Sequence, residues 1–583
     1  MNIFLRFLIT GGTGAVLSLL TTWVLTHYFF GEAHYMSAYV VGIAVNLLFN
    51  FVAYTLAVFQ TKQDHVRRLL IFVFYGIIMA LLQGSTVALI TSAVGTGYYL
   101  FVIACVIAFF SLFNFSIFKL SIFKERAHKE KASPRAILTF IIVCATLLKL
   151  AVAFHVLAIG GNKPFVYGDA VSYIELAHHI QIGEGFASSR ATGVLQDEVF
   201  RTPGLPLLLA PFSANETSLT WYFVLLALVS GILLPYFIFG VASYFVSPVT
   251  GLVAATLVAF EPHLVFFSML PQTETPFMLF SYGALLATLY AHRENKLLFS
   301  VFGGILFGYS VLIRPGFLPT FVVALTLTIG YFAWQKLSLK HLGALLIGLL
   351  ALLSPWYIRT HAITGVYSLS GAGWRNVYTD YLASVRAIEH HTDFSSEKRN
   401  LKDQSEEAGV PTQQIDNPAY GKKLRDYSLK ELWLHKTTVL KLEPVLIFSY
   451  FTQDGYYYQF ERFLLIPPDD GSPHISPTFL LLHKGFAAVP DVLHELSRQL
   501  FIPIVGRIFT IGMFLLSLCG FFLTKHKFRF VFLVVIALSA LTSTVIGLGV
   551  EARLRLPVEP ILYIFAAVSL TQGISWLHRR HEA

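Results

Sequence analysis

Apolar runs long enough to cross a bilayer recur along almost the whole chain, and they constrain its fold more than any other feature. A transmembrane helix needs about 20 consecutive apolar residues. Only 13% of the 583 residues are charged, whereas an ordinary soluble domain carries about 25%. We therefore predict an all-α polytopic membrane protein of about fourteen transmembrane helices. The runs lie at roughly 4–29, 36–59, 69–94, 98–123, 135–158, 220–246, 251–269, 273–291, 297–313, 315–334, 341–360, 501–523, 529–549 and 556–577.

The short basic clusters between these runs fall on one side of the membrane if the N-terminus is cytoplasmic. Lys and Arg gather at 61–68 and 119–135, whereas the loop at 31–35 contains neither. Cytoplasmic loops carry an excess of Lys and Arg. The pattern predicts cytoplasmic N- and C-termini and two long extracytoplasmic loops, 158–220 and 361–500. It also accounts for the net charge of +9 without a nucleic-acid partner, because the basic residues are dispersed between apolar runs.

A polar, charged stretch divides the chain into two predicted modules. Residues 1–125 are expected to form a four-helix membrane domain, 126–134 a basic cytoplasmic linker, and 135–583 a larger helical bundle with both long loops. The first module contains a repeat, since Asn50–Phe59 and Asn114–Phe123 share their Asn-Phe start and their final Phe. We interpret the repeat as two copies of a helical hairpin, with chance similarity among apolar residues as the alternative.

Charged side chains separated in sequence lie at one membrane level under this topology. A charge at the centre of a transmembrane helix costs about 3 kcal/mol, and a charge near the interface costs less. Each residue alone could therefore be a solvated helix end, but carboxylates and arginines together beside the long loops favour a shared site. The residues are Asp169, Arg201, Glu261, His263, Glu274, Arg314, Trp356, Arg359, Arg375, Glu551, Arg553 and Arg555.

This combination of residue types suits transfer from a phosphate-bearing donor to an alcohol. Guanidinium groups bind phosphate bidentately. Carboxylates take a proton from a hydroxyl group or bind a metal. Nucleotide donors are not expected outside the cytoplasm, so a lipid-linked phosphosugar is the expected donor.

Several segments resemble signatures of GT-C membrane glycosyltransferases, in particular the protein O-mannosyltransferase and lipid A aminoarabinose transferase group. Tyr167-Gly-Asp169-Ala-Val-Ser-Tyr173 resembles the motif in the first outer loop of that family. Five further segments follow in the family's order and on the expected side of the membrane. They are Arg201-Thr-Pro-Gly-Leu-Pro206, Gln272-Thr-Glu274-Thr, Leu312-Ile-Arg-Pro315, Ser354-Pro-Trp356-Tyr-Ile-Arg359 and Glu551-Ala-Arg-Leu-Arg-Leu-Pro557.

The resemblance implies a role for each matching residue. Asp169 would be the general base, with a helix-capping role as its alternative, and Glu274 would support it, orient the acceptor or share a cation. The donor phosphate would be bound by Arg359, Arg314, Arg553 and Arg555. Substrate contacts would come from Tyr167, Tyr173, Arg201, Glu261, His263, Trp356 and Glu551. No cofactor is required by the resemblance, although a divalent cation, Mg²⁺ or Mn²⁺, is left open.

The first 125 residues resemble the GtrA family of four-helix membrane proteins, which is associated with polyprenyl-phosphate sugars. Gly11, Gly12, Asn46, Asn50 and Phe59 match its loose pattern. Together the resemblances imply a multi-pass protein of a bacterial or archaeal cytoplasmic membrane.

The predicted activity is an inverting glycosyltransferase that moves a hexose or pentose from polyprenyl phosphate to an acceptor hydroxyl at the outer face. The acceptor would be a glycan, a lipid or a protein, and the N-terminal module would assist donor supply. Two other functions stay open: a polyprenyl-phosphate-sugar flippase or transporter without transferase activity, and a structural assembly partner.

Overall fold

The structure is a computed structural model in which two compact units are distinguished. It describes residues 3–25, 45–59, 133–189, 193–334, 339–466 and 502–582, with scattered positions between 68 and 119 and between 487 and 499. One unit comprises Met1–Ala132 with Ala151–Gly161, and the other Ser133–Leu150 with Asn162–Ala583. The described residues are mainly helical. Their strands are the antiparallel pair β1 (Ala187–Ser188) and β2 (Gln196–Asp197).

In the N-terminal unit, α1 (Ile3–Leu25) contacts the π-helical segment η3 (Tyr54–Val58) through an aromatic core. The rings of Tyr54 and Phe118 lie 5.6 Å apart, and each is the fifth residue of its copy of the predicted repeat. Both copies therefore contribute the same position to one core, which supports the two-hairpin interpretation. Most of the predicted spans 69–94 and 98–123 lies outside the described residues. The buried core residues are Phe7, Phe51, Tyr54, Val58, Phe72 and Phe118.

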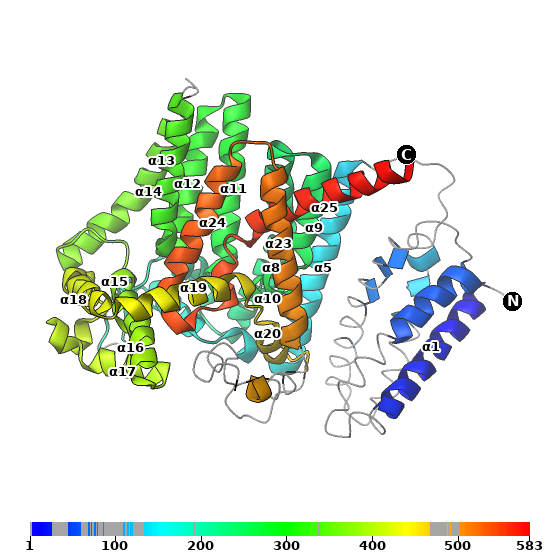
Figure 1. Cartoon of the computed structure of the whole chain (residues 1–583), viewed down its shortest axis with the longest axis horizontal. Helices are drawn as coiled ribbons and strands as arrows, with labels where there is room; N and C mark the ends of the chain where they lie inside the picture. Colours follow the sequence, from blue (N-terminus) through cyan, green and yellow to red (C-terminus); the bar gives the residue numbers. More distant parts are fainter. Residues whose placement is uncertain are drawn as a thin grey trace. The chain divides into compact units, whose positions relative to one another are not determined.

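The larger unit is built on long helices that run side by side (Figure 1). Asn215 caps α8 by accepting a hydrogen bond from the backbone N–H of Ser218, and Ser247 caps α9 by accepting one from that of Thr250. Each cap side chain thereby pairs an N–H group that has no partner within its own helix. The long helices are α8 (Glu216–Phe245), α9 (Pro248–Phe260), α11 (Glu274–Glu294), α12 (Leu297–Ile313), α13 (Leu318–Trp334), α14 (Lys340–Thr364), α23 (Ile502–Leu523), α24 (Arg529–Ser543) and α25 (Glu559–Glu582), together with residues 134–150 of α5 (Pro134–Gly160).

Small residues let two of these helices touch through their backbones. A Cβ atom at Gly304 of α12 would lie 2.0 Å from the carbonyl oxygen of Leu345. A Cβ atom at Gly348 of α14 would lie 2.1 Å from that of Val301. This reciprocal contact is the small-residue packing that membrane helices use.

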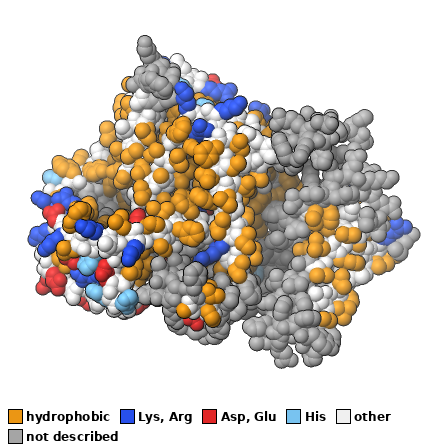
Figure 2. Space-filling model, viewed as in Figure 1, with side chains coloured by type: hydrophobic (Ala, Val, Ile, Leu, Met, Phe, Trp, Pro, Cys, Tyr) orange, Lys and Arg blue, Asp and Glu red, His pale blue; other side chains and the backbone are white. Residues whose placement is uncertain are grey.

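The described residues form a multi-pass membrane protein. Five helices are long and apolar enough to span, and α12 with Pro315–Gly330 forms a sixth candidate, bent by 120°. The predicted run 251–269 is divided, because α9 ends at Phe260 and α10 (Pro262–Phe267) follows. Figure 2 shows hydrophobic side chains over the middle of the bundle and charged side chains near its ends. The exact number of fourteen spans stays a prediction.

Residues 366–462, here called the cap, fold into short helices at one end of the bundle (Figure 1). Their own core contains Tyr378, Leu382, Leu401 and Leu424. The elements are α15 (Ala372–Asn376), η9 (Val377–Tyr381), α16 (Leu382–His390), α17 (Phe394–Asp403), η10 (Ser405–Ala408), η11 (Thr412–Gln414), η12 (Pro418–Tyr420), α18 (Gly421–Leu434), α19 (Lys436–Thr452) and α20 (Tyr456–Arg462).

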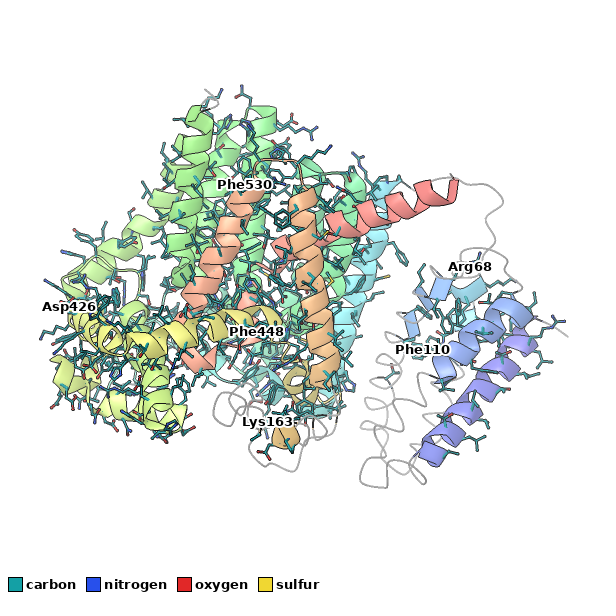
Figure 3. All side chains as sticks on the ribbon, in the orientation of Figure 1. Arg68, Phe110, Lys163, Asp426, Phe448 and Phe530 are labelled. Atoms are coloured by element: carbon teal, nitrogen blue, oxygen red, sulfur yellow. The ribbon has the colours of Figure 1, made fainter. Side chains whose placement is uncertain are left out.

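Within the cap, α19 crosses α23 and α24, so the cap packs on the bundle through a helix that runs across the others (Figure 1). Phe448 of this helix is 63% exposed (Figure 3). Asp426, also labelled in Figure 3, lies on the neighbouring cap helix α18. An exposed aromatic side chain on a helix that crosses the bundle fits a position near lipid headgroups.

Candidate active site

The Arg-Thr-Pro-Gly segment packs against the end of α12, and this contact positions the first arginine of the site. The helix α7 (Gly204–Leu209) starts at Gly204. A Cβ atom at this position would lie only 2.5 Å from the backbone carbonyl carbon of Leu312. Tyr309 donates a hydrogen bond to the carbonyl oxygen of Gly204 at 2.9 Å. Only glycine allows this approach. The motif thereby brings Arg201 to a cavity that Arg314 also lines.

Asp169 is the first residue of α6 (Asp169–Gln181), and two arginines flank its carboxylate. The Nη2 atom of Arg201 lies 3.0 Å from its Oδ1, and the Nη1 atom of Arg553 lies 3.6 Å from its Oδ2. The preceding Gly168 has a φ of +55°, a conformation that favours glycine. The Asp169 side chain remains 45% exposed, so its carboxylate is accessible from the cavity.

The charge state of this cluster follows from its pairing. Burial acts to raise the pKa of the Asp169 carboxyl, but attraction to Arg201 and Arg553 outweighs burial and holds that pKa below its ordinary value. Burial acts to lower the pKa of Arg553, but attraction to Glu551, Glu274 and Asp169 raises it above the ordinary value. Asp169 is therefore ionised at neutral pH, and Arg553 is protonated.

A third arginine is held by the acidic residue that opens α11. Arg314 donates to Oε1 of Glu274 at 2.8 Å and to the hydroxyl of Thr273 at 3.2 Å. The Glu274 side chain is only 4% exposed, and that of Arg314 is 16% exposed. Glu274 thus lies behind Arg314 and orients its guanidinium group at the cavity wall.

These residues surround a polar cavity of about 940 Å³. Tyr173 and Arg201 form part of its wall, with the Arg201 guanidinium 4.5 Å from the centre of the Tyr173 ring. Cationic side chains outnumber acidic ones in the lining, which suits an anionic ligand. The charged lining residues are Asp169, Arg201, Arg314, Arg375, Asp380, Lys398 and Arg553.

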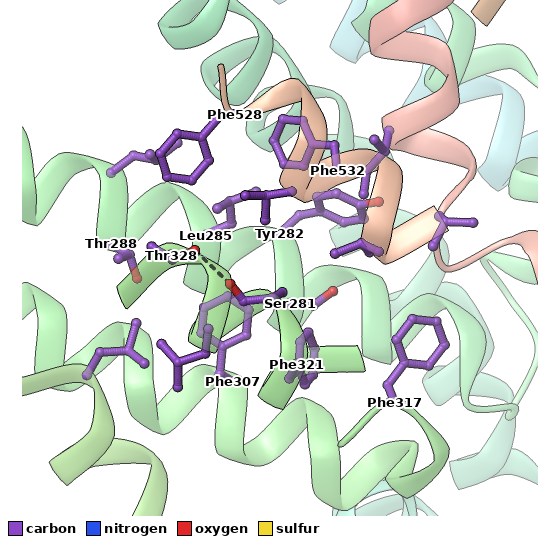
Figure 4. Close-up of a pocket in the computed structure, with 18 of the residues that line it drawn as sticks. Ser281, Tyr282, Leu285, Thr288, Phe307, Phe317, Phe321, Thr328, Phe528 and Phe532 are labelled. Atoms are coloured by element: carbon purple, nitrogen blue, oxygen red, sulfur yellow. Dashed lines mark hydrogen bonds between the residues drawn. The ribbon is translucent and has the colours of Figure 1, made fainter. Parts of the chain in front are cut away.

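An apolar cavity of about 370 Å³ adjoins the polar one, and Phe317 and Leu318 line both. Aromatic side chains such as Phe307, Phe321 and Phe532 project into it (Figure 4). A ligand with a charged head and a hydrocarbon tail could therefore place the head beside Arg314 and the tail among these rings.

Two predicted residues flank the cavity without lining it. Glu551 lies 3.0 Å from Nε of Arg553 and so orients this guanidinium group. The ring of Tyr167 is covered by the guanidinium group of Arg462, at 3.5 Å from its centre.

Arg359 and Trp356 lie elsewhere, on α14. Arg359 binds Asp197 at 2.8 Å and the carbonyl oxygen of Phe186 at 3.0 Å, and it stacks on Trp356 at 4.9 Å. The structure therefore uses Arg359 to fasten the loop that carries β1 and β2, and it does not bring this residue into the cavity lining.

Arg555, Glu261 and His263 belong to a second, buried polar cluster. Arg555 pairs with Glu559 at 2.8 Å. Glu261 accepts a hydrogen bond from Tyr456 at 2.8 Å, and His263 packs 4.8 Å from the Tyr456 ring. All three predicted residues are at most 3% exposed. They are absent from the lining of the polar cavity, so their predicted substrate contacts are not part of this arrangement.

The cap brings Arg375, which the sequence predicted for the shared site, to the same cavity. It also contributes Trp374, Asp380 and Lys398, which the sequence did not assign to the site. No family motif covers this part of the chain. The available signal was the cluster of aromatic and charged residues at 374–380. Within the described part of the chain, no group of three or more His, Cys, Asp or Glu side chains is arranged to hold a metal ion.

Comparison with protein families confirms both resemblances. Residues 6–123 match the model of the GtrA/DPMS transmembrane domain. Residues 201–358 match the model of the dolichyl-phosphate-mannose-protein mannosyltransferases. No curated protein and no solved structure matches the chain. The chain therefore carries a GtrA/DPMS transmembrane domain and a dolichyl-phosphate-mannose-protein mannosyltransferase segment, a combination that supports a polyprenyl-phosphate-sugar-dependent glycosyltransferase in general.

Proposed function

We propose that the protein is an inverting glycosyltransferase that moves a hexose or pentose from a polyprenyl phosphate to an acceptor hydroxyl at the outer face of the membrane. One observation carries the proposal: Asp169 meets Arg201, Arg314 and Arg553 around a polar cavity that adjoins an apolar one. A carboxylate, several guanidinium groups and a hydrocarbon-lined pocket match the three parts of such a reaction: acceptor, phosphate and lipid tail.

The acceptor step requires a base that is ionised and accessible, and Asp169 meets both requirements. In this proposal the acceptor oxygen attacks the anomeric carbon as its proton passes to Asp169. The bond from the anomeric carbon to the phosphate oxygen breaks, and attack opposite this bond inverts the anomeric centre through an oxocarbenium-like state. A positioned base contributes about 10²–10⁴-fold.

The leaving group gains negative charge as it departs, because a phosphodiester becomes a phosphomonoester. Arg201, Arg314 and Arg553 would stabilise this charge through charge-assisted hydrogen bonds. Glu274 and Glu551 would fix two of these guanidinium groups before the donor arrives, since each already pairs with one arginine.

Donor binding would also change the strength of the base. Arg201 and Arg553 hold the pKa of Asp169 below its ordinary value in the free protein. A donor phosphate that takes hydrogen bonds from the same guanidinium groups would weaken their hold on the carboxylate. The carboxylate would then become more basic when the sugar is in place.

The chain organisation gives the N-terminal module its proposed place. Residues 1–125 would supply donor to the transferase module at 135–583 through the shared membrane, with 126–134 as the cytoplasmic linker. The GtrA/DPMS match supports a role in handling the lipid-linked sugar. The positive-inside pattern supports an outer-face site and cytoplasmic termini.

The test uses purified full-length protein in lipid nanodiscs and a panel of labelled polyprenyl-phosphate hexoses and pentoses. We expect release of polyprenyl phosphate, with a product of inverted anomeric configuration, and a loss of about 10²-fold or more in Asp169→Asn. Asp426→Asn is the matched control, since Asp426 lies on the cap surface with its side chain 56% exposed. Donor movement across the bilayer of sealed proteoliposomes, with no release in any variant, would instead indicate a transporter.

A further inference from the structure

We infer that the cap end of the polar cavity is the acceptor subsite and that it takes a neutral, hydroxyl-rich glycan. This inference rests on the transferase proposed above. It concerns cap residues for which no family motif or comparison gives a role, namely Trp374, Asn376, Asp380 and Lys398.

The position of the apolar pocket separates the two ends of the cavity. Phe317 and Leu318 line both cavities and lie three and four residues after Arg314, so the lipid phosphate would lie at the bundle end. Trp374 and Lys398 line the cavity from the cap instead. The end supplied by the cap is thus available to the second substrate.

The cations of the cap end are already committed to carboxylates. Arg375 lies 3.0 Å from Asp416 and 3.6 Å from Asp380, and Lys398 forms an ion pair with the same Asp380. The Asp380 side chain is only 4% exposed, so the carboxylate that joins the two cations lies within the wall. The cap end thus presents one guanidinium group, engaged by two carboxylates, whereas three guanidinium groups line the bundle end, so hydroxyl groups suit the cap end better than a phosphate does.

Aromatic side chains at this end offer faces to a sugar ring. Trp374 is 38% exposed and has no aromatic partner among the residues that the structure describes. Tyr367 also lines the cavity, is 70% exposed, and has one face stacked on His361 at 4.1 Å. The apolar C–H face of a sugar packs on such rings while its hydroxyl groups reach polar neighbours. Arg375 fixes one of these neighbours by donating to Oδ1 of Asn376 at 3.3 Å.

Two hydrogen bonds hold this end in register with the proposed catalytic cluster. The backbone N–H of Gly371 donates to the carbonyl oxygen of Val199 at 3.0 Å, and the hydroxyl of Ser370 donates to that of Phe200 at 2.6 Å. The Phe200 ring lies between two guanidinium groups, 5.7 Å from that of Arg201 and 5.2 Å from that of Arg375. A glycan on the cap wall would therefore lie one aromatic ring away from the Arg201–Asp169 pair.

The test compares Trp374→Ala and Trp374→Phe with Trp433→Ala, a matched control whose indole is 72% exposed on α18. Two readouts are used on full-length protein in nanodiscs. One is the acceptor KM with a donor that the unaltered protein turns over. The other is donor-free binding of fluorescent neutral hexose trisaccharides, with a panel of Ser- and Thr-containing peptides in parallel.

We expect Trp374→Ala to raise the acceptor KM and to weaken trisaccharide binding by about tenfold. Trp374→Phe should have a smaller effect, because it keeps an aromatic face. The donor KM should stay within about twofold in both variants, and Trp433→Ala should match the unaltered protein.

Unchanged acceptor KM and trisaccharide binding in Trp374→Ala would overturn the glycan subsite and leave the transferase standing. Use of peptides in place of trisaccharides would also overturn it. Absence of polyprenyl phosphate release from every donor would instead overturn the transferase. Trisaccharide binding needs no turnover, so its loss or retention in Trp374→Ala would still decide the glycan subsite in that case.

Discussion

The pair formed by Arg314 and Glu274 allows a quantitative test, because the two residues are given different tasks. Their charged atoms lie 2.8 Å apart, and Glu274 is almost completely buried. Coulomb attraction at this distance is about 6 kcal/mol at an effective dielectric constant of about 20. Desolvation offsets part of it, so removing one partner of a buried pair costs about 3–5 kcal/mol. Arg314→Gln should lower the free energy of unfolding by about this amount, because it leaves the more deeply buried carboxylate of Glu274 without its partner.

The double variant separates the fold from the chemistry. Glu274→Gln combined with Arg314→Gln leaves two neutral amides, which should recover most of the stability. Glu274→Gln alone keeps the guanidinium group that would bind phosphate. Donor affinity should therefore fall about tenfold or more in Arg314→Gln and in the double variant, since hydrogen bonds to charged groups contribute about 1.5–3 kcal/mol.

The two readouts are thermal unfolding in detergent and donor binding in nanodiscs. At about 1 °C per kcal/mol for a chain of this length, Arg314→Gln should lower the unfolding midpoint by about 3–5 °C. The reasoning is refuted if the double variant recovers donor affinity together with stability, because Arg314 would then act only through the fold. It is also refuted if Arg314→Gln changes stability by less than about 1 kcal/mol, the range of an exposed ion pair.

Two further predictions use close packing and burial. Gly204→Ala should destabilise the protein by about 3 kcal/mol or more and reduce turnover, because its Cβ atom would overlap the backbone of Leu312. Thermal unfolding measures the effect, and Gly343→Ala is the control, because the space around Gly343 is open. Burial raises the pKa of Asp454 to about 6, so the folded state binds the extra proton between about pH 4 and 6. Stability should fall by about 3 kcal/mol as pH rises through this window, and a pH series with Asp454→Asn should lack that fall.

Much of the membrane architecture could be predicted because lipid imposes a simple rule on sequence. Apolar runs of about 20 residues have few alternatives to helices. The helices α8, α11 and α14 accordingly lie close to their predicted runs. The break at Glu261 was missed, because the run around it is apolar on both sides and only Glu261-Pro262 marks the helix end.

The candidate site was only partly predictable, for a different reason. Asp169, Arg201 and Arg314 lie in segments that resemble family motifs, and the structure gathers them around one cavity. Arg555 lies only two residues from Arg553, and a sequence cannot state which of two such side chains faces a cavity. The turn η15 (Ala552–Arg555) points them apart, since Arg553 lines the cavity whereas Arg555 pairs with buried Glu559.

The proposed chemistry also makes the strength of the base depend on bound donor. Arg201 and Arg553 depress the pKa of Asp169 in the absence of donor, so an acceptor that arrives first meets a weak base. A donor phosphate that occupies these guanidinium groups would restore basicity, so Asp169 becomes an effective base only when donor is bound, whichever substrate binds first. Product inhibition by polyprenyl phosphate should then be competitive with donor and noncompetitive with acceptor in initial-rate measurements. Arg553→Lys should reduce the effect of bound donor on the basicity of Asp169. An ammonium group lacks the bidentate fork that lets phosphate and carboxylate compete for one guanidinium group. A pattern in which polyprenyl phosphate competes with acceptor would contradict the shared-arginine argument, since the two substrates would then occupy one end of the cavity.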